Sequence, residues 1–248
     1  MKTYFNAFFM CQSMFCAIPS PQIWDEKARD KMLLFLPVVG LELGLCWYAL
    51  AWLCQFLALP GLLRALVLVC WPWLSTGFLH LDGFMDVTDA VKSCRNPERR
   101  REILKDPHVG SFAVIGIVLL CLAQFACFAS VPEGVDLRIL IFVPAVSRCG
   151  SVLAVLLLPA MSTSQYAGQG SGKGRFVVPG GMLLLFLSGG FVFCGKYGVV
   201  LLGVGAGYAL ALRRGYRSLG GMNGDIAGYA LTIAELSGAA MLAMGGMV

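Results

Sequence analysis

The sequence predicts an all-α, polytopic integral membrane protein, and three observations support that prediction. Only 13% of the 248 residues are charged, about half of the ~25% that is usual for a soluble chain. Apolar residues make up 58% of the chain, and the mean hydropathy is +0.77. The apolar stretches run for about 20 residues without the alternation of a β-strand, so we expect a helix bundle rather than a closed barrel. Soluble, disordered and disulfide-rich secreted classes are excluded.

Seven stretches are long and apolar enough to be candidate transmembrane helices. They are residues 32–57, 61–80, 110–130, 138–159, 178–194, 198–212 and 226–246. Ahead of them, residues 5–18 predict a helix that lies in the membrane interface and is ended by Pro19 and Pro21. We expect one membrane domain over 1–248, with an N-terminal interfacial segment at 1–31 and a cytoplasmic catalytic and basic loop at 81–109.

The basic residues predict the orientation of this bundle. Residues 1–31, 81–109, 160–177 and 213–225 hold 15 Lys and Arg, whereas the opposite loops hold only Arg64, Arg138 and Lys196. Cytoplasmic loops of membrane proteins carry the excess of Lys and Arg. We therefore expect a cytoplasmic N-terminus, an outer C-terminus, and a location in the cytoplasmic (inner) membrane with the polar loops facing the cytoplasm.

The ten cysteines are scattered and mostly lie inside apolar runs, and no CxxC pair occurs. This distribution is typical of small apolar residues in membrane helices rather than of a zinc site or a disulfide framework.

An acidic motif follows the second candidate span. In HLDGFMDVTDA, residues 80–90, Asp82, Asp86 and Asp89 stand at i, i+4 and i+7. On a helix they share an arc of roughly 60° along about 10 Å of the axis. Carboxylates this close at a membrane boundary need a cation, and Mg²⁺ or Mn²⁺ prefers carboxylate oxygen and commonly bridges to phosphate. The pattern favours metal-dependent phosphate chemistry, with a solvated acidic helix end and a transport pathway as alternatives.

A basic segment comes next, KSCRNPERRREILKDPHVG at residues 92–110. Guanidinium groups suit phosphate oxygens, and the free N–H groups at the start of the following helix also favour phosphate. The candidate substrate-binding residues here are Arg99, Arg100, Arg101, Lys105, Asp106, His108 and Gly110. The alternative is a loop whose charges only fix the topology.

The third piece is GGMNGD, residues 220–225, at the start of the last span. Asp225 is either a plain N-cap or a fourth carboxylate on the same face as the acidic motif. Ionisable residues inside spans are functional candidates by default. Arg148 is expected to neutralise one of the intramembrane acids Glu42 and Glu235, and Arg148 and Asn223 complete the candidate substrate-binding set. The candidate metal ligands are Asp82, Asp86, Asp89, Asp225 and Glu42.

The stretch GQGSGKGR, residues 168–175, is not a phosphate-binding loop of the Walker type. Ala167 stands where the pattern needs its first Gly, and Gly174 stands where it needs Ser or Thr. We expect a flexible cytoplasmic loop.

Together these motifs resemble the cobalamin synthase family, the membrane adenosylcobinamide-GDP ribazoletransferases. The likeness is carried by HLDGFMDVTDA, by LKDPHVGSFAV, by the intramembrane pair Ser147-Arg148, and by GGMNGD with a downstream Glu. It covers nearly the whole chain. One departure is Asp106-Pro107-His108, where the family commonly has Asp-Ser-Arg.

The resemblance implies a reaction and its partners. A hydroxyl of α-ribazole, or of its 5′-phosphate, would attack the phosphate on cobinamide in adenosylcobinamide-GDP, releasing GMP and forming adenosylcobalamin or its 5′-phosphate. It implies Mg²⁺ as cofactor, with Asp82, Asp86 and Asp89 as ligands, completed by Asp225. Either Asp89 or Asp225 would accept the hydroxyl proton. The expected partners are these substrates and the lipid bilayer, with no nucleic acid; a homo-oligomer is left open.

Two other classes compete with this interpretation. CDP-alcohol phosphotransferases and UbiA-type prenyltransferases also set aspartates at helical spacing near the cytoplasmic boundary, but the first has an aspartate three residues before the Asp-Gly, and the second usually has two such motifs. A cation or corrinoid transporter would need carboxylates at several depths of the bilayer, and only Glu42 and Glu235 lie deep.

Overall fold

A computed structural model of the chain describes residues 2–162, 164 and 174–245, so residues 168–173 of the GQGSGKGR stretch lie outside the described residues. Every regular element in the described part is a helix, which confirms the predicted all-α class. The chain opens with α1 (Lys2–Phe15), the short α2 (Glu26–Met32) and a 3₁₀ turn, η1 (Leu33–Phe35). The helix expected at residues 5–18 therefore exists but begins and ends three residues earlier.

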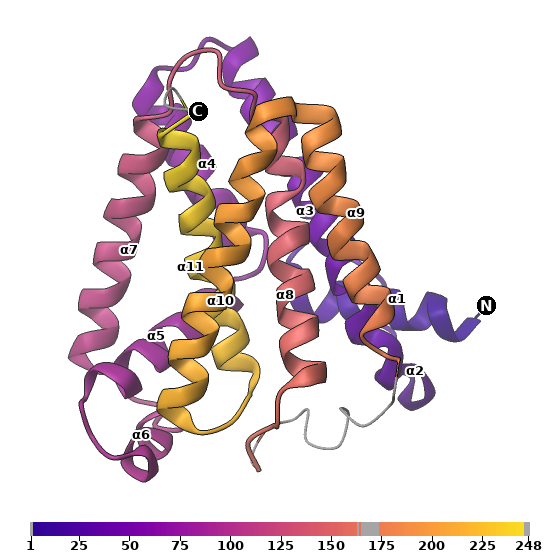
Figure 1. Cartoon of the computed structure of the whole chain (residues 1–248), viewed down its shortest axis with the longest axis vertical. Helices are drawn as coiled ribbons and strands as arrows, with labels where there is room; N and C mark the ends of the chain where they lie inside the picture. The colour runs from indigo at the N-terminus through magenta and orange to yellow at the C-terminus, as the bar shows by residue number, and fades with distance from the viewer. Residues whose placement is uncertain (1, 163, 165–173, 246–248) are drawn as a thin grey trace.

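The remaining helices form the bundle. They are α3 (Leu36–Phe56), α4 (Gly61–Leu74), α5 (Leu79–Lys92), α6 (Pro97–Ile103), α7 (Ser111–Ala129), η2 (Leu137–Ile141), α8 (Val143–Leu157), α9 (Val177–Cys194), η3 (Gly195–Gly198), α10 (Val199–Leu219) and α11 (Gly224–Ala243). The long helices α3, α7, α8, α9, α10 and α11 run side by side along the longest axis (Figure 1).

Several of these helices are membrane-spanning candidates in length and composition. Five stretches of the described residues qualify, and α4 with α5 makes a sixth if that bent pair is counted as one span. One of the five, Val177–Leu219, holds both α9 and α10, which run in opposite directions as the arms of a hairpin (Figure 1). The chain is thus a polytopic membrane protein, and the number of seven crossings stays a prediction.

The predicted continuous span over residues 61–80 is wrong. The helix stops at Leu74, and α5 leaves at 85° to α4. Gly77 and Phe78 both adopt positive φ, at 58° and 64°. This left-handed backbone cannot continue a right-handed helix, and it is uncommon for a bulky residue such as Phe78. The acidic motif therefore lies on a separate helix that crosses the bundle instead of extending it.

The polar segments gather at one end of the molecule. In Figure 1 the α5–α6 segment and the α10–α11 turn lie at the lower end, α1 and α2 lie in the lower half, and the C-terminus lies at the top. The end of α8 is tied to the α10–α11 turn, because Met161 N–H donates to Met222 O and Met222 N–H donates to Pro159 O, both at 2.9 Å. The described parts of the basic segments 1–31, 81–109 and 213–225 thus lie toward one end of the molecule, and the side of the membrane that this end faces stays a prediction.

Close helix contacts in the core depend on glycine. A β-carbon at Gly40 of α3 would lie 2.6 Å from the carbonyl oxygen of Pro144 and 2.7 Å from Cδ of Arg148 in α8. The side chain of Arg148, which is 1% exposed, packs into the space that the missing β-carbon of Gly40 leaves. All ten cysteines are free; five are buried, four are partly buried and Cys94 is exposed, so most of them pack within the helix bundle.

Candidate active site

The amphipathic helix α5 positions the acidic motif. Its apolar face, with Leu81 and Phe84, forms a small core cluster with Leu120 of α7. The ring of Phe84 also stacks on that of Tyr229 in α11, with 5.7 Å between the ring centroids. Burying this face against α7 and α11 turns the other side of α5, which carries the aspartates, away from the apolar core.

Two glycines bring α5 and α11 into backbone contact. A β-carbon at Gly83 would lie 2.9 Å from the carbonyl oxygen of Asp225, and one at Gly228 would lie 3.3 Å from the Cα of His80. Thr232 Oγ1 also donates a hydrogen bond to the carbonyl oxygen of His80, at 3.2 Å. The helix crossing therefore sets Asp225 beside the first turn of the acidic motif, although Asp225 and Asp82 are 143 positions apart in the sequence.

The four aspartates form one acidic group. The carboxylate of Asp86 interacts electrostatically with those of Asp82, Asp225 and Asp89. Asp82 is exposed, and the other three are partly buried. Within the described residues, none of the four forms an ion pair with Lys, Arg or His. The group therefore carries negative charge that no neighbouring side chain of the described chain neutralises.

The donor set suits a hard divalent cation in its chemistry. No three His, Cys, Asp or Glu side chains in the described ranges are gathered closely enough to hold a metal ion by themselves. Mg²⁺, however, is commonly bound through only one or two carboxylates, with waters and substrate phosphates completing the octahedron. The unpaired carboxylates fit that mode of binding.

A wide cavity opens at the C-terminal end of α5. It has a volume of about 1060 Å³, and its lining includes Asp89, Arg95, Arg99, Gly110 and Ser111. A methyl group at Gly110 would overlap both carboxylate oxygens of Asp89, so this glycine lets Asp89 lie against the start of α7. Acid, arginine and a helix N-terminus thus meet in one polar, open space that suits a phosphate with its metal.

A second, smaller cavity of about 240 Å³ lies at the N-terminal end of α5. Its polar lining residues are His80, Asp82, Ser151 and Asp225. The rest of its lining is apolar or glycine and comes from α1, η1, α3, α5, α8 and α11. The aspartate stripe therefore connects two cavities of different character, with Asp82 and Asp225 at one and Asp89 at the other.

The basic residues of α6 divide into two groups. Arg100 Nη1 donates to Ser218 O at 3.4 Å, and Arg101 Nε donates to Leu219 O at 2.7 Å, so both satisfy carbonyls at the C-terminal end of α10. Arg99 is exposed beside the wide cavity and pairs with Glu102. Of the three arginines predicted to hold phosphate, Arg99 alone lines one of the two cavities described above; phosphate binding by Arg100, Arg101 and the exposed Lys105 stays a prediction.

Asp106 and His108 form a local turn on the surface. The backbone N–H of His108 donates to Asp106 Oδ1 at 3.0 Å, and its ring Nδ1 lies 2.6 Å from the same oxygen. These hydrogen bonds hold the pKa of the Asp106 carboxyl below its ordinary value. The two residues lie in the loop before Gly110, and these hydrogen bonds join them to each other and not to the aspartate group.

The GGMNGD turn is built as a helix cap. Asn223 is the N-cap of α11 and accepts a hydrogen bond from Ile226 N–H at 3.0 Å. Its side-chain amide also donates to Asp225 Oδ2 at 2.6 Å. Asp225 is therefore not the N-cap itself: Asn223 has that role and orients the carboxylate.

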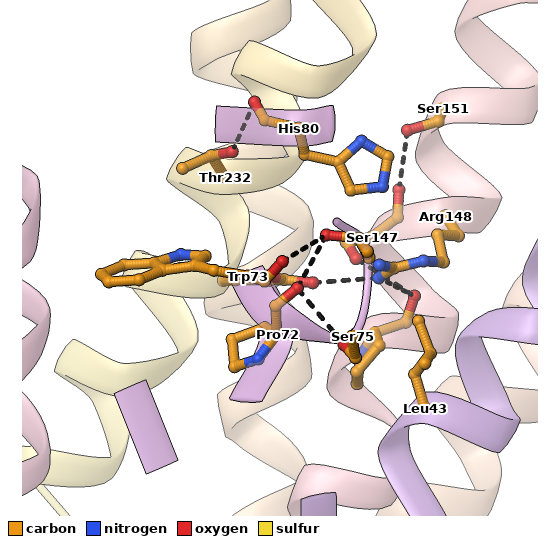
Figure 2. Close-up of polar contacts among 12 residues, drawn as sticks. Leu43, Pro72, Trp73, Ser75, His80, Ser147, Arg148, Ser151 and Thr232 are labelled. Carbon is orange, nitrogen blue, oxygen red and sulfur yellow. Dashed lines mark hydrogen bonds and ion pairs between the residues drawn. The ribbon is translucent and has the colours of Figure 1, made fainter. Parts of the chain in front are cut away.

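The intramembrane acids have different partners. Arg148 Nη1 donates to Glu235 Oε1 at 2.9 Å, with the two side chains 1% and 4% exposed. This assigns the counter-charge that the sequence left open. Figure 2 shows the arginine between Ser147 and Leu43, below the ring of His80. Glu42 instead accepts a hydrogen bond from Gln12 Nε2 of α1 at 2.9 Å. Substrate binding by Arg148 and metal binding by Glu42 stay predictions, and the burial of Arg148 argues against direct contact with substrate.

Comparison with known proteins identifies the family. The model of the cobalamin-5-phosphate synthase family matches residues 7–243. The chain belongs to the cobalamin-5-phosphate synthase family. Among the curated members of this family, the adenosylcobinamide-GDP ribazoletransferase of Clostridium perfringens (strain 13 / Type A) is 37% identical over 248 residues, which covers 98% of this chain and 99% of the relative. No solved structure matches the chain.

More distant members of the family carry the same name. The adenosylcobinamide-GDP ribazoletransferase of Clostridium botulinum (strain Alaska E43 / Type E3) is 32% identical, covering 96% of this chain and 97% of the relative. That of Desulfitobacterium hafniense (strain Y51) is 32% identical, covering 88% of each chain. The likeness extends over nearly the full length, so the acidic motif, the basic segment and the last helix all lie within it.

His80 and Ser151 were missed as cavity residues in the sequence analysis. For His80 a signal existed, because it stands two residues before Asp82 in the same motif. For Ser151, in the middle of an apolar helix, nothing in the sequence distinguishes it from the neighbouring Ser147.

Proposed function

We propose that the chain is an adenosylcobinamide-GDP ribazoletransferase of the cytoplasmic membrane. The match to curated relatives of that name over nearly the whole chain carries the proposal. The aspartate group between two cavities supports it, because a transferase that joins two substrates needs a separate space for each.

The proposed chemistry is transfer of a phosphoryl group that carries cobinamide. The oxygen of an acceptor hydroxyl on α-ribazole, or its 5′-phosphate, forms a bond to the cobinamide-linked phosphorus of adenosylcobinamide-GDP. The bond from that phosphorus to the bridging diphosphate oxygen breaks, and GMP leaves with the oxygen. The hydroxyl proton passes to a carboxylate, Asp89 or Asp225.

Mg²⁺ is proposed as the cofactor, which one or two carboxylates of the group Asp82, Asp86, Asp89 and Asp225 would hold in combination with the substrate diphosphate. When bound, it would neutralise charge that develops on the phosphoryl oxygens. The role of the protein is to hold the aspartate carboxylates in place. Gly83 and Asn223 hold Asp225 beside α5, and the absence of ion pairs within the described residues leaves the carboxylates open to a cation. Arg99, beside the wide cavity, is proposed to bind a phosphate oxygen.

The proposed active face is cytoplasmic. The segments 1–31, 81–109 and 213–225 are rich in Lys and Arg, and the described parts of these segments lie in the lower half of the molecule in Figure 1. Both the acidic motif and the GGMNGD turn belong to that end.

The test is turnover by the purified protein in detergent. GMP release and corrinoid product are measured with adenosylcobinamide-GDP, α-ribazole and Mg²⁺, and then after removal of metal with EDTA and readdition of Mg²⁺ or Mn²⁺. We expect activity that EDTA abolishes and either metal restores. Activity that persists in EDTA would contradict the metal proposal without affecting the transferase proposal.

The rival classes are separated by the same assay. A CDP-alcohol phosphotransferase would release CMP from its own substrate, and a prenyltransferase would release diphosphate. A transporter would move corrinoid or cation across proteoliposomes without any GMP release, and that result would overturn the enzymatic proposal.

A further inference from the structure

The smaller cavity has an apolar body and a polar end. Apolar side chains from three helices form much of the wall: Phe15, Leu36, Val152 and Val155. The polar end contains His80, Asp82 and Asp225. Such a space suits a ligand that is itself divided into an apolar ring and a hydroxyl-bearing part.

The size of the cavity limits what can enter it. Its volume is about 240 Å³, below the roughly 300–1,000 Å³ of sites that take drug-sized ligands. A nucleoside diphosphate or a corrin macrocycle exceeds this space, whereas one fused bicyclic aromatic ring fits. The wide cavity at the other end of α5, at about 1060 Å³ and lined by Arg95 and Arg99, has the size and charge for the nucleoside diphosphate part of the donor.

One atom in the smaller cavity lacks a partner. Nε2 of His80 is shielded from solvent and has no hydrogen bond within the described residues. The backbone of this residue is fixed, because Thr232 Oγ1 donates to its carbonyl oxygen and Gly228 packs against its Cα. Figure 2 shows the imidazole turned toward α8, on the side of Ser151. Buried polar atoms are normally hydrogen-bonded, so an unpaired one at a cavity wall indicates a ligand that supplies the bond.

We propose that this cavity binds the nucleoside acceptor, with its weakly polar aromatic base between the apolar walls and its sugar hydroxyls toward Asp82 and Asp225. His80 supplies a hydrogen bond to the bound nucleoside. The inference rests on the proposed function, since it assigns the acceptor of that reaction to one of the two cavities. It also gives α1 a role, because this interfacial helix provides Met14 and Phe15 to the cavity.

The first test fills the cavity. Val155→Phe should raise the KM for α-ribazole by tenfold or more and leave the KM for adenosylcobinamide-GDP unchanged. The matched control is Val118→Phe on α7, where Val118 is 50% exposed on the outside of the bundle and faces neither cavity. Free dimethylbenzimidazole, which is the aromatic base of α-ribazole, should inhibit competitively against α-ribazole and not against the donor.

Two further variants serve if Val155→Phe does not fold, as judged by gel filtration in detergent. Met14→Trp narrows the cavity at a side chain that is 40% exposed, with Met244→Trp, at 43% exposure, as control. His80→Phe keeps a ring but removes the hydrogen bond. Each should weaken binding of α-ribazole several-fold, measured directly by equilibrium dialysis.

The outcomes separate this proposal from the proposed function. Turnover by the wild-type chain with an unchanged KM for α-ribazole in the folded cavity variants would overturn the cavity assignment and leave the transferase intact. If the wild-type chain binds α-ribazole but shows no turnover, and Val155→Phe or Met14→Trp weakens that binding, the cavity assignment is supported and the transferase proposal is contradicted. Dimethylbenzimidazole that competes only with the donor would overturn the assignment.

Discussion

At the scale of single residues, the best-defined interaction is the buried ion pair of Arg148 and Glu235. The guanidinium also donates to Pro144 O at 3.2 Å, while its Nε has no partner in the described part of the chain. Removing one member of such a pair leaves the other charge buried and uncompensated, whereas replacing both with apolar residues is often tolerated.

Arg148→Met should therefore destabilise the fold by about 3–5 kcal/mol, as measured by denaturation in mixed micelles. The double variant Arg148→Met with Glu235→Leu should recover most of that stability. Equal destabilisation by the single and double variants would mean that the arginine contributes through packing against Gly40 and not through its charge.

The aspartates are expected to act on chemistry rather than on stability. Asp82→Asn keeps the size of the side chain but removes the charge offered to a cation, and we expect activity to fall by about 100-fold or more. Turnover under saturating Mg²⁺ measures this effect. Glu133→Gln, an exposed acid in the loop after α7, is the matched control and should retain activity.

At the scale of elements, the site depends on the crossing of α5 with α11. The helix axis bends by 85° between α4 and α5, and this bend lets the acidic helix α5 lie against the start of α11. Gly83 has no side chain at the point of closest approach, where a β-carbon would lie 3.0 Å from the Cα of Asp225. The atoms that a β-carbon at position 83 would meet belong to the backbone of Asp225 and cannot rotate away as a side chain can. A residue larger than glycine at this position therefore has to displace one of the two helices.

Gly83→Ala should consequently reduce activity by about tenfold or more while the protein stays folded, because a small misplacement of catalytic groups is costly. Gly205→Ala on α10 is the matched control, since a β-carbon there meets nothing within 4 Å. It removes a helical glycine, which by itself stabilises by roughly 0.5–1 kcal/mol. Equal activity of the two variants would show that the crossing tolerates a shift.

At the scale of the whole molecule, the charges predict one orientation in the membrane. One set of segments holds 15 basic residues and the opposite loops hold three. Because cytoplasmic loops carry the excess, this difference predicts that Lys105 lies inside and Glu133 outside. Alkaline phosphatase fused after Lys105 should be inactive, and the same enzyme fused after Glu133 should be active. The reverse pattern would place the aspartate group on the outer face and contradict the proposed cytoplasmic reaction.

The sequence by itself determined the all-helical membrane class, the helical spacing of Asp82, Asp86 and Asp89, and the family resemblance. These features are local: hydropathy, 3.6-residue periodicity and short motifs are properties of neighbouring residues. Only the tertiary structure decided that Arg148 pairs with Glu235, that Asp225 lies beside α5, that the chain bends before Leu79, and that two cavities share one aspartate stripe. Each of those depends on how distant helices pack, and a pattern along one chain does not record which of several acids a buried arginine will meet.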